Sequence, residues 1–200
     1  MFRFAHLSDP HLPLPAVRAR DLLSKRVTGW LSWRYRRRRI HAPDALAAAL
    51  ADLRRAAPDH VAVTGDIANI STAAEFRQAA AWLGELGRPE DVTLVPGNHD
   101  AYVPVSWASS LGLWGAYMAG DGASPPTSRD DFPLLRRRGP VAFVGLSTAV
   151  PRAPLIATGE VGEAQLARFE AMMRDLRGLC RVVLIHHPPQ IGGASRHKEL

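Results

Sequence analysis

Apolar residues recur in short runs along the chain, separated by longer stretches of mixed character. Each run is about as long as a buried β-strand and is rich in β-branched residues, which favour strands. The pattern therefore predicts five strands, at residues 2–7, 60–64, 91–95, 141–146 and 181–185.

Two stretches between these runs have helical character. Alanine and leucine repeat over residues 44–57 and stop before a proline, while residues 72–86 are followed by a glycine. Thr72 and Glu75 stand at capping-box spacing, in which each side chain accepts a hydrogen bond from the other's backbone N–H. Both stretches are predicted to form helices.

A third helix is predicted at residues 163–176, where apolar side chains recur at helical spacing and should face the core. This stripe consists of Leu166, Phe169, Met173 and Leu176. Strands that alternate with helices are typical of an α/β fold with a partly parallel sheet. The periodicity therefore predicts the α/β class.

Two long segments interrupt the alternation, and we interpret them as insertions or caps on a single domain that spans residues 1–200. Residues 12–42 contain two prolines, three aromatic residues and a run of arginines. Residues 101–139 contain Trp107, Trp114, Tyr117 and Met118, then a loop rich in Gly, Asp, Ser and Pro. Long connections in compact domains are often functional.

Composition excludes several classes of protein. A single cysteine, Cys180, excludes an internal disulfide framework and a zinc finger of several cysteines. It precedes an apolar run and is predicted to be a small buried side chain. No apolar stretch approaches the roughly 20 residues that cross a bilayer. The first residues lack the apolar core of a signal peptide, so we expect a cytoplasmic protein without a transmembrane segment.

Positive charge is in excess, with 25 lysines and arginines against 19 acidic residues. Much of it lies in two runs, residues 136–138 and a first run made of Arg34, Arg36, Arg37, Arg38 and Arg39. One interpretation is a solvated basic face; the other is contact with an anionic substrate, nucleic acid or an anionic membrane surface. Residues 30–39 are then expected to form a basic amphipathic helix.

Candidate chemistry follows four of the predicted strands. Ligand sites in open α/β sheets form just beyond the carboxyl ends of strands. Here those ends run into Ser-Asp-Pro-His, Gly-Asp, Gly-Asn-His-Asp and His-His. The side chains expected around one crevice are Asp9, His11, Asp66, Asn98, His99 and His186.

The chemistry of this set favours a metal site. Carboxylate, amide and imidazole groups without a thiolate suit manganese, iron or zinc. A carboxylate such as Asp66 can bridge two cations, and two divalent ions about 3.5–4 Å apart clamp both oxygens of an in-line displacement at phosphorus. Such ions also lower the pKa of a shared water molecule. The alternative is that the same residues only cap helices and form turns.

In these motifs the chain resembles the calcineurin-like metallophosphoesterases. The family's blocks Asp-x-His, Gly-Asp, Gly-Asn-His-Asp and a histidine after a strand occur in order within residues 4–189. The resemblance implies a four-layer β-sandwich flanked by helices. It also implies hydrolysis of phosphoric esters by hydroxide activated at a dinuclear metal centre, and it is greatest to bacterial phosphodiesterases.

The resemblance further implies a role for each matching residue. The two divalent ions would share Asp66, one binding Asp9, His11 and Asp66 and the other Asp66, Asn98 and His186. His99 would be the catalytic imidazole that acts on the leaving oxygen, and Asp100 would orient it.

The sequence departs from the family pattern at one place. It contains no Gly-His dipeptide, so the family's closing Gly-His-x-His block is missing. We therefore expect a C-terminally truncated form of the fold, in which each ion keeps three protein ligands. The alternative to an active enzyme is a weakly active or inactive fragment that binds phosphate compounds or a partner.

Residues 65–69 narrow the choice of substrate. They read Gly-Asp-Ile-Ala-Asn and lack the Gly-Asp-x-x-Asp-Arg-Gly motif of protein serine/threonine phosphatases, which argues against that branch. The expected substrate is a small phosphoester, either a nucleotide or a lipid-linked phosphodiester.

The remaining histidines and the aromatic residues have ordinary interpretations. His6, inside the first predicted strand, is expected in the core. His187 is expected to support its neighbour from the opposite side of the strand, and His60 to have no special role. The aromatic residues predicted to pack a core are Trp107, Trp114 and Tyr117.

Overall fold

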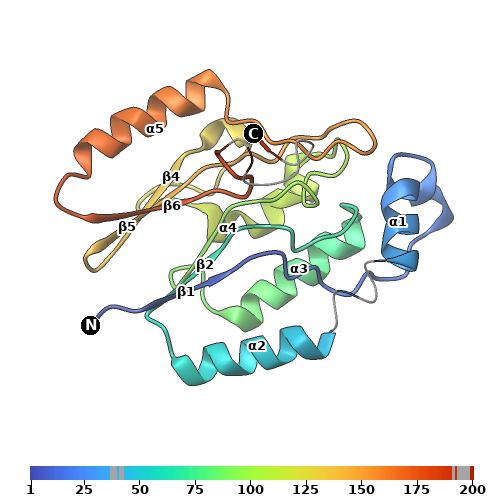
Figure 1. Cartoon of the computed structure of the whole chain (residues 1–200), viewed down its shortest axis with the longest axis horizontal. Coiled ribbons are helices and arrows are strands. Elements are labelled where there is room, and N and C mark those ends of the chain that lie inside the picture. The colour runs from blue at the N-terminus through green and yellow to red at the C-terminus, as the bar shows by residue number, and fades with distance from the viewer. Residues whose placement is uncertain (37–39, 41–42, 191, 193–198) are drawn as a thin grey trace.

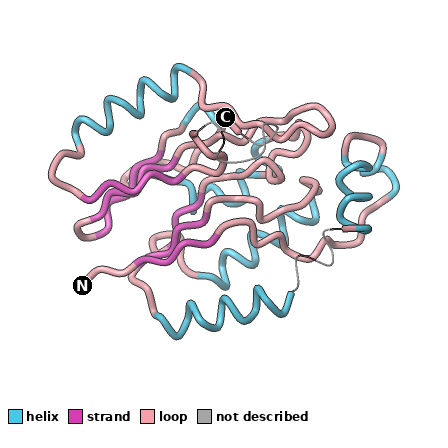
Figure 2. Tube along the Cα trace, in the orientation of Figure 1, coloured by secondary structure: helices cyan, strands magenta, loops and turns pink. Residues whose placement is uncertain are grey.

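The computed structural model describes residues 1–36, 40, 43–190, 192 and 199–200. A first sheet contains β1 (Phe4–Leu7), β2 (His60–Val63) and β3 (Val92–Leu94) in the order β1-β2-β3, with both pairs parallel. These strands form where the sequence predicts them, within two residues at each end. Their carboxyl ends meet at one edge, where Figure 2 shows the loops gathered.

A second sheet contains β4 (Leu134–Arg138), β5 (Val141–Gly145) and β6 (Cys180–Leu184). β5 pairs antiparallel with β4 and parallel with β6. The two sheets face each other: the ring of Phe143 on β5 lies 5.2 Å from that of Phe4 and 4.8 Å from that of His60. The shared core lies between them and under the helices of the first sheet.

Helices cover the outer faces of both sheets (Figure 1). α2 (Pro43–Ala56) and α3 (Ala73–Leu86) cover the first sheet, and α5 (Glu163–Asp175) covers the second. Leu176, just after α5, packs with Ala142 and Val144 of β5. Helix, sheet, sheet and helix form four layers, so the predicted α/β sandwich flanked by helices is confirmed.

Local signals account for the helix boundaries. The hydroxyl of Thr72 accepts the N–H of Glu75 at 3.2 Å, and the Glu75 carboxylate accepts the N–H of Thr72 at 2.8 Å, so the capping box is confirmed. The stripe on α5 is only partly correct. Leu176 is buried and Phe169 and Met173 pack against its cluster, but the side chain of Leu166 is 46% exposed.

The long segments contain shorter elements. Within residues 12–42 the structure forms η1 (Ala19–Leu22) and α1 (Arg26–Tyr35). Within residues 101–139 it forms η3 (Trp107–Ser109), η4 (Leu111–Trp114), α4 (Gly115–Met118) and η5 (Arg129–Asp131). The three aromatic residues predicted to pack the core, Trp107, Trp114 and Tyr117, do so.

β4 is a strand that the hydrophobic pattern does not predict, because three of its five residues are arginine. Arg136 faces the first sheet and is buried. Its guanidinium donates to the carbonyls of Ala119, Ala116 and Val92, at 2.6 to 2.7 Å, and to that of Pro89. Burial lowers its pKa to about 10. The interpretation of the second arginine run as a solvated basic face is therefore wrong at this position.

Two further predictions of burial are wrong because the residues lie on edge strands. Cys180 begins β6, the last strand of the second sheet as described, and is exposed. His6 lies on β1, the corresponding edge of the first sheet, and is exposed, with Nε2 2.8 Å from the Thr64 hydroxyl. His60, on the central strand β2, is buried instead.

Candidate metal centre

The loops that follow β1 and β2 continue side by side beyond the sheet. The N–H of Asp9 donates to the carbonyl of Gly65 at 3.1 Å, and that of His11 to the carbonyl of Asp66 at 3.1 Å. Parallel pairing thus extends past the strand ends and brings the first two signature blocks together. His186 joins them from the second sheet, where it lies two residues beyond β6.

Three of these residues have left-handed backbone conformations. The φ angles are 54° for Asp9, 37° for His11 and 56° for Asp66. Residues other than glycine rarely adopt positive φ, and such strain concentrates at functional sites. The strained positions thus lie in the loops after β1 and β2, at residues whose side chains carry candidate donor atoms.

Two glycines let the loops approach closely. Gly65 has φ +82°, and a Cβ there would lie 2.7 Å from the Cα of Gly97. A Cβ on Gly97 would lie 2.6 Å from the backbone N of Asp66 and 2.8 Å from Cε1 of His186, and closer still to Oδ1 of Asp66. The glycines of the Gly-Asp and Gly-Asn blocks therefore provide room for the side chains beside them.

The carboxylate of Asp66 lies at the centre of the group. Its Oδ2 is 3.7 Å from Nε2 of His11 and 3.5 Å from Nε2 of His186. Its Oδ1 accepts the N–H of His99 at 2.7 Å. Nε2 of His11 also lies 4.0 Å from Oδ1 of Asp9. One carboxylate oxygen is thus placed between two imidazoles from different sheets.

Backbone carbonyls fix the tautomers of three imidazoles. Nδ1 of His11 donates to the carbonyl of Ala68 at 3.0 Å, Nδ1 of His99 to that of Asn69 at 2.6 Å, and Nδ1 of His186 to that of Thr64 at 2.6 Å. A carbonyl can only accept, so each neutral ring carries its proton on Nδ1 and its lone pair on Nε2. This second hydrogen bond is the one that metal-binding histidines typically make.

Lone pairs therefore converge on common points. Nε2 of His186 lies 3.2 Å from Oδ1 of Asn98, an amide oxygen that also only accepts. Two groups of donor atoms within 4.8 Å of one another share Asp66: His11, Asp66 and His99 in one, and Asp9, Asp66 and His186 in the other. This oxygen and nitrogen donor set fits borderline divalent cations.

Asp100 stabilises the backbone of the same loops. Its buried carboxylate accepts the N–H groups of Asp66 at 2.7 Å, Ala68 at 2.8 Å and Gly97 at 2.9 Å. Burial, and then the nearby Asp66 carboxylate, raise the pKa of Asp100. The sequence resemblance implies that Asp100 orients His99, whereas the structure places the carbonyl of Asn69 on the ring of His99.

Sequence reasoning missed two residues that support His99. The Glu75 carboxylate accepts the N–H of Asn69 at 2.6 Å and so holds the residue that binds His99. The ring of Tyr102 stacks on His99, with centroids 5.4 Å apart and planes 8° from parallel. Lys25 lies 4.1 Å above the Tyr102 ring centroid. Only Glu75 gave a signal in the sequence, through its capping box.

His187 has the supporting position that the sequence predicts. It is buried, with Nδ1 2.6 Å from the Thr148 hydroxyl and Nε2 3.0 Å from the carbonyl of Ala157. Burial lowers its pKa to about 4. Its ring packs edge-on against His186 at 4.9 Å. His187 therefore fixes the position of its neighbour.

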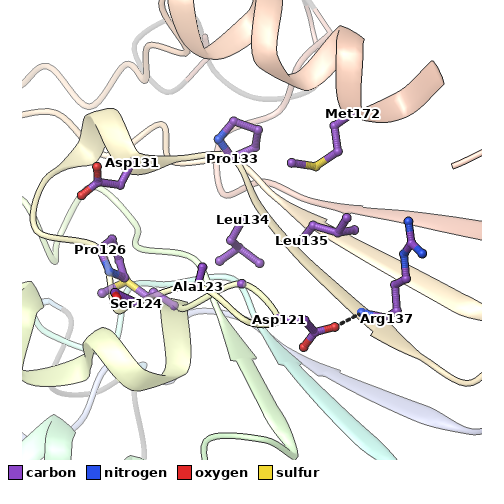
Figure 3. Close-up of a pocket in the computed structure, with 12 residues that line it drawn as sticks. Asp121, Ala123, Ser124, Pro126, Asp131, Pro133, Leu134, Leu135, Arg137 and Met172 are labelled. Carbon is purple, nitrogen blue, oxygen red and sulfur yellow. Dashed lines mark hydrogen bonds between the residues drawn. The ribbon is translucent and has the colours of Figure 1, made fainter. Parts of the chain in front are cut away.

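A cavity of about 470 Å³ lies elsewhere, between β4, α5 and the loop after α4 (Figure 3). Leu134, Leu135 and Met172 provide apolar lining. Its acidic residues already have partners: Asp121 accepts the N–H of Arg137, and Asp131 accepts the N–H of Thr127. None of the candidate metal ligands lines it.

The two arginine runs differ in what the structure shows. Arg34 and Arg36 are exposed at the end of α1, whereas Arg37, Arg38 and Arg39 lie outside the described residues. Among the described helices, none has both the length and the apolar character needed to span a membrane.

The fold and the site together define a class of protein: four-layer α/β sandwiches with histidine and carboxylate donors at the strand ends. The profile of the calcineurin-like phosphoesterase family matches residues 2–198 of the sequence. The chain therefore belongs to the calcineurin-like phosphoesterase family. Members bind divalent metals and hydrolyse phosphoesters, and this chain contains candidate metal-binding groups. A search of curated proteins found no match to the sequence.

Proposed function

We propose that this protein is a phosphodiesterase-like hydrolase with two divalent ions, manganese, iron or zinc, at the shared Asp66. The observation that carries the proposal is the pair of donor groups that have Asp66 in common. Oδ2 of this carboxylate lies between two Nε2 atoms, as a bridging ligand requires. Asp9, His11, Asn98 and His186 complete the proposed ligand set, and a cytoplasmic location is part of the same proposal.

When bound, such a pair of ions neutralises charge at the phosphoryl group and lowers the pKa of a water molecule. The protein's own contribution is orientation. His11 and His186 are held by backbone carbonyls, and Asp66 by the N–H of His99. Well-oriented groups lower the barrier because little reorganisation is needed during the reaction.

His99 is the proposed proton donor to the leaving oxygen. Its Nδ1 is engaged with the carbonyl of Asn69, so the proton that a protonated ring can transfer resides on Nε2. Stacking on Tyr102 and the hydrogen bond to Asn69 restrict the ring to one orientation. General acids of this kind typically contribute about 10²–10⁴-fold to the rate.

Hydrolysis of bis(p-nitrophenyl) phosphate with added manganese tests the proposal. We expect turnover that requires the metal and that Asp66→Ala abolishes. The matched control is Asp52→Ala, because the Asp52 side chain is 78% exposed and, within the part of the chain that the structure describes, pairs with the exposed Arg55 on the same helix. Metal-independent turnover, or full turnover in Asp66→Ala, would contradict the proposal.

A second candidate function is binding of phosphate compounds without turnover. It is favoured by the small number of ligands: among the described residues, each proposed ion has three, namely Asp9, His11 and Asp66 for one and Asp66, Asn98 and His186 for the other. Three ligands do not exclude catalysis, since catalytic zinc sites commonly keep three protein ligands and an open position. Metal analysis separates the two candidates: near two ions per chain favours the enzyme, and near zero favours binding alone.

A further inference from the structure

The helix α1 has two faces of different character. On one face, a Cβ added to Gly29 would lie 2.6 Å from a side-chain carbon of Ile70, so the helix backbone docks closely there. Arg26 strengthens this docking: Nε donates to the carbonyl of Ile70 at 3.0 Å and Nη2 to that of Ser71 at 2.8 Å. The Thr28 hydroxyl lies 3.1 Å from that of Tyr102.

The opposite face is apolar and exposed. Val27, Leu31 and Tyr35 follow one another at intervals of four residues along α1, and Leu23 precedes them just before the helix; their exposed fractions lie between 38% and 87%. At 3.6 residues per turn this spacing forms one stripe. Leu31 then lies nearly opposite Gly29. The outer face of a docked helix is normally polar. An apolar stripe there indicates an interaction surface.

The segment of sequence that contains this stripe carries a strong positive charge. Residues 12–42 contain nine basic residues and one acidic residue, Asp21, whereas the rest of the chain contains 16 basic and 18 acidic residues. The whole excess of positive charge therefore lies in this segment. Arg34 is exposed beside Leu31, and Arg36 is exposed at the end of α1.

We propose that the α1 stripe, Leu23, Val27, Leu31 and Tyr35 with Arg34 and Arg36, docks on an anionic lipid surface. Helices that lie in a membrane interface combine an apolar face with flanking basic residues in this way. Anionic lipids attract each such basic residue when it lies near the membrane surface. DNA favours the charges but gives no role to an apolar stripe, and a second copy of the chain would bring its own arginines close to these.

The position of α1 relates this surface to the candidate metal centre. Figure 1 shows α1 beyond the carboxyl ends of β1 and β2, where the loops of the centre lie. α1 also contacts Tyr102, which stacks on His99. Docking at α1 therefore brings the centre close to phosphoesters of the lipid headgroups. Docking itself requires neither metal nor turnover, so its test is independent of the proposed function.

The test is cosedimentation of the full chain, in the presence of a chelator, with two kinds of vesicle. One contains phosphatidylcholine alone and the other phosphatidylcholine mixed with phosphatidylglycerol. We expect binding to the anionic vesicles that falls as salt rises, since charge attraction is screened. The double variants Val27→Ser/Leu31→Ser and Arg34→Gln/Arg36→Gln should each bind about tenfold more weakly or worse.

Matched controls change residues of the same type elsewhere on the surface. Leu166→Ser and Arg174→Gln alter exposed positions on α5, which covers the second sheet, and should bind as the unchanged protein does. Thermal unfolding checks that each variant is folded. Absence of vesicle binding at low salt, or equal binding by the α1 variants, overturns the proposal. So does binding only to a DNA duplex, or a dimer that Val27→Ser/Leu31→Ser dissociates.

Discussion

Replacing Gly97 with alanine tests the candidate metal centre at its tightest contact. The added Cβ would lie 2.8 Å from Cε1 of His186 and 2.6 Å from the backbone N of Asp66. Carbon contacts are normally about 3.5–4.0 Å, so the His186 ring must move about 0.7 Å or more away from the new Cβ, and the backbone of Asp66 must also move. A displacement of about 1 Å costs on the order of 10²-fold in rate, and disturbed ligand orientation costs about 10–100-fold in metal affinity.

Two measurements on Gly97→Ala separate the effect on the site from an effect on the fold. Manganese titration by calorimetry should show affinity lowered at least tenfold, while urea unfolding of the metal-free protein should show a loss of about 1–3 kcal/mol. Gly84→Ala is the control: a Cβ there meets nothing within 4 Å, and α3 should gain up to about 1 kcal/mol. Unchanged manganese affinity in Gly97→Ala would refute the assignment of Asp66 and His186 as ligands.

Three further predictions concern buried polar groups. Arg136→Met should lower the free energy of unfolding by about 3 kcal/mol in urea titrations, because four carbonyls lose their donor. Burial lowers the pKa of His60 from 6.5 to about 4, so the unfolded chain binds the proton more readily and stability falls as the pH drops through this range. When the pH is lowered from 7 to 5, the free energy of unfolding of the unchanged protein should fall by up to about 2 kcal/mol more than that of the His60→Leu variant, as measured by urea unfolding at each pH. Glu75→Gln should lower the free energy of unfolding by about 1–2 kcal/mol, as measured by thermal unfolding. It should also lower kcat and leave KM nearly unchanged, because it weakens the loop that orients His99.

Each of these predictions has its own control. Arg137→Met changes the exposed neighbour of Arg136 on the same strand and should alter stability by no more than about 0.5 kcal/mol. Glu85→Gln makes the Glu75 substitution at an exposed position of the same helix. Equal losses of stability in Arg136→Met and Arg137→Met, or in Glu75→Gln and Glu85→Gln, would contradict the roles given to Arg136 and Glu75. The role given to His60 would be contradicted if the stability of the unchanged protein and that of His60→Leu changed with pH in the same way.

The strands that the sequence predicts are those with continuous apolar runs. β4 is not predicted, because its sequence Leu-Leu-Arg-Arg-Arg contains no continuous apolar run and its successive residues alternate between buried and more exposed positions. Arg136 lies inside because carbonyls from distant loops surround its guanidinium, and no local pattern encodes that arrangement. On edge strands the error is the reverse, because a residue predicted to be buried is exposed. Cys180 is of a type usually found in the core, but among the described residues no further strand pairs with the outer side of β6.

The candidate site is predictable from the sequence to the extent that it depends on topology. Parallel strands that end at one edge bring Asp9, Asp66 and Asn98 near one another, and this follows from the order of the strands. The contacts that set their orientation use backbone atoms. The carbonyl on each imidazole and the three N–H groups on Asp100 depend on loop conformation, which side-chain identity alone does not specify.

These backbone contacts also explain why Gly97→Ala should lower metal affinity directly, in addition to its effect on folding. The left-handed turns at Asp9, His11 and Asp66 are fixed by N–H groups and carbonyls that belong to the loops themselves. The donor atoms consequently converge within 4.8 Å in the structure without an ion. A site organised in this way needs little rearrangement to bind a cation, so a small displacement of its ligands reduces affinity directly while most of the fold keeps its packing.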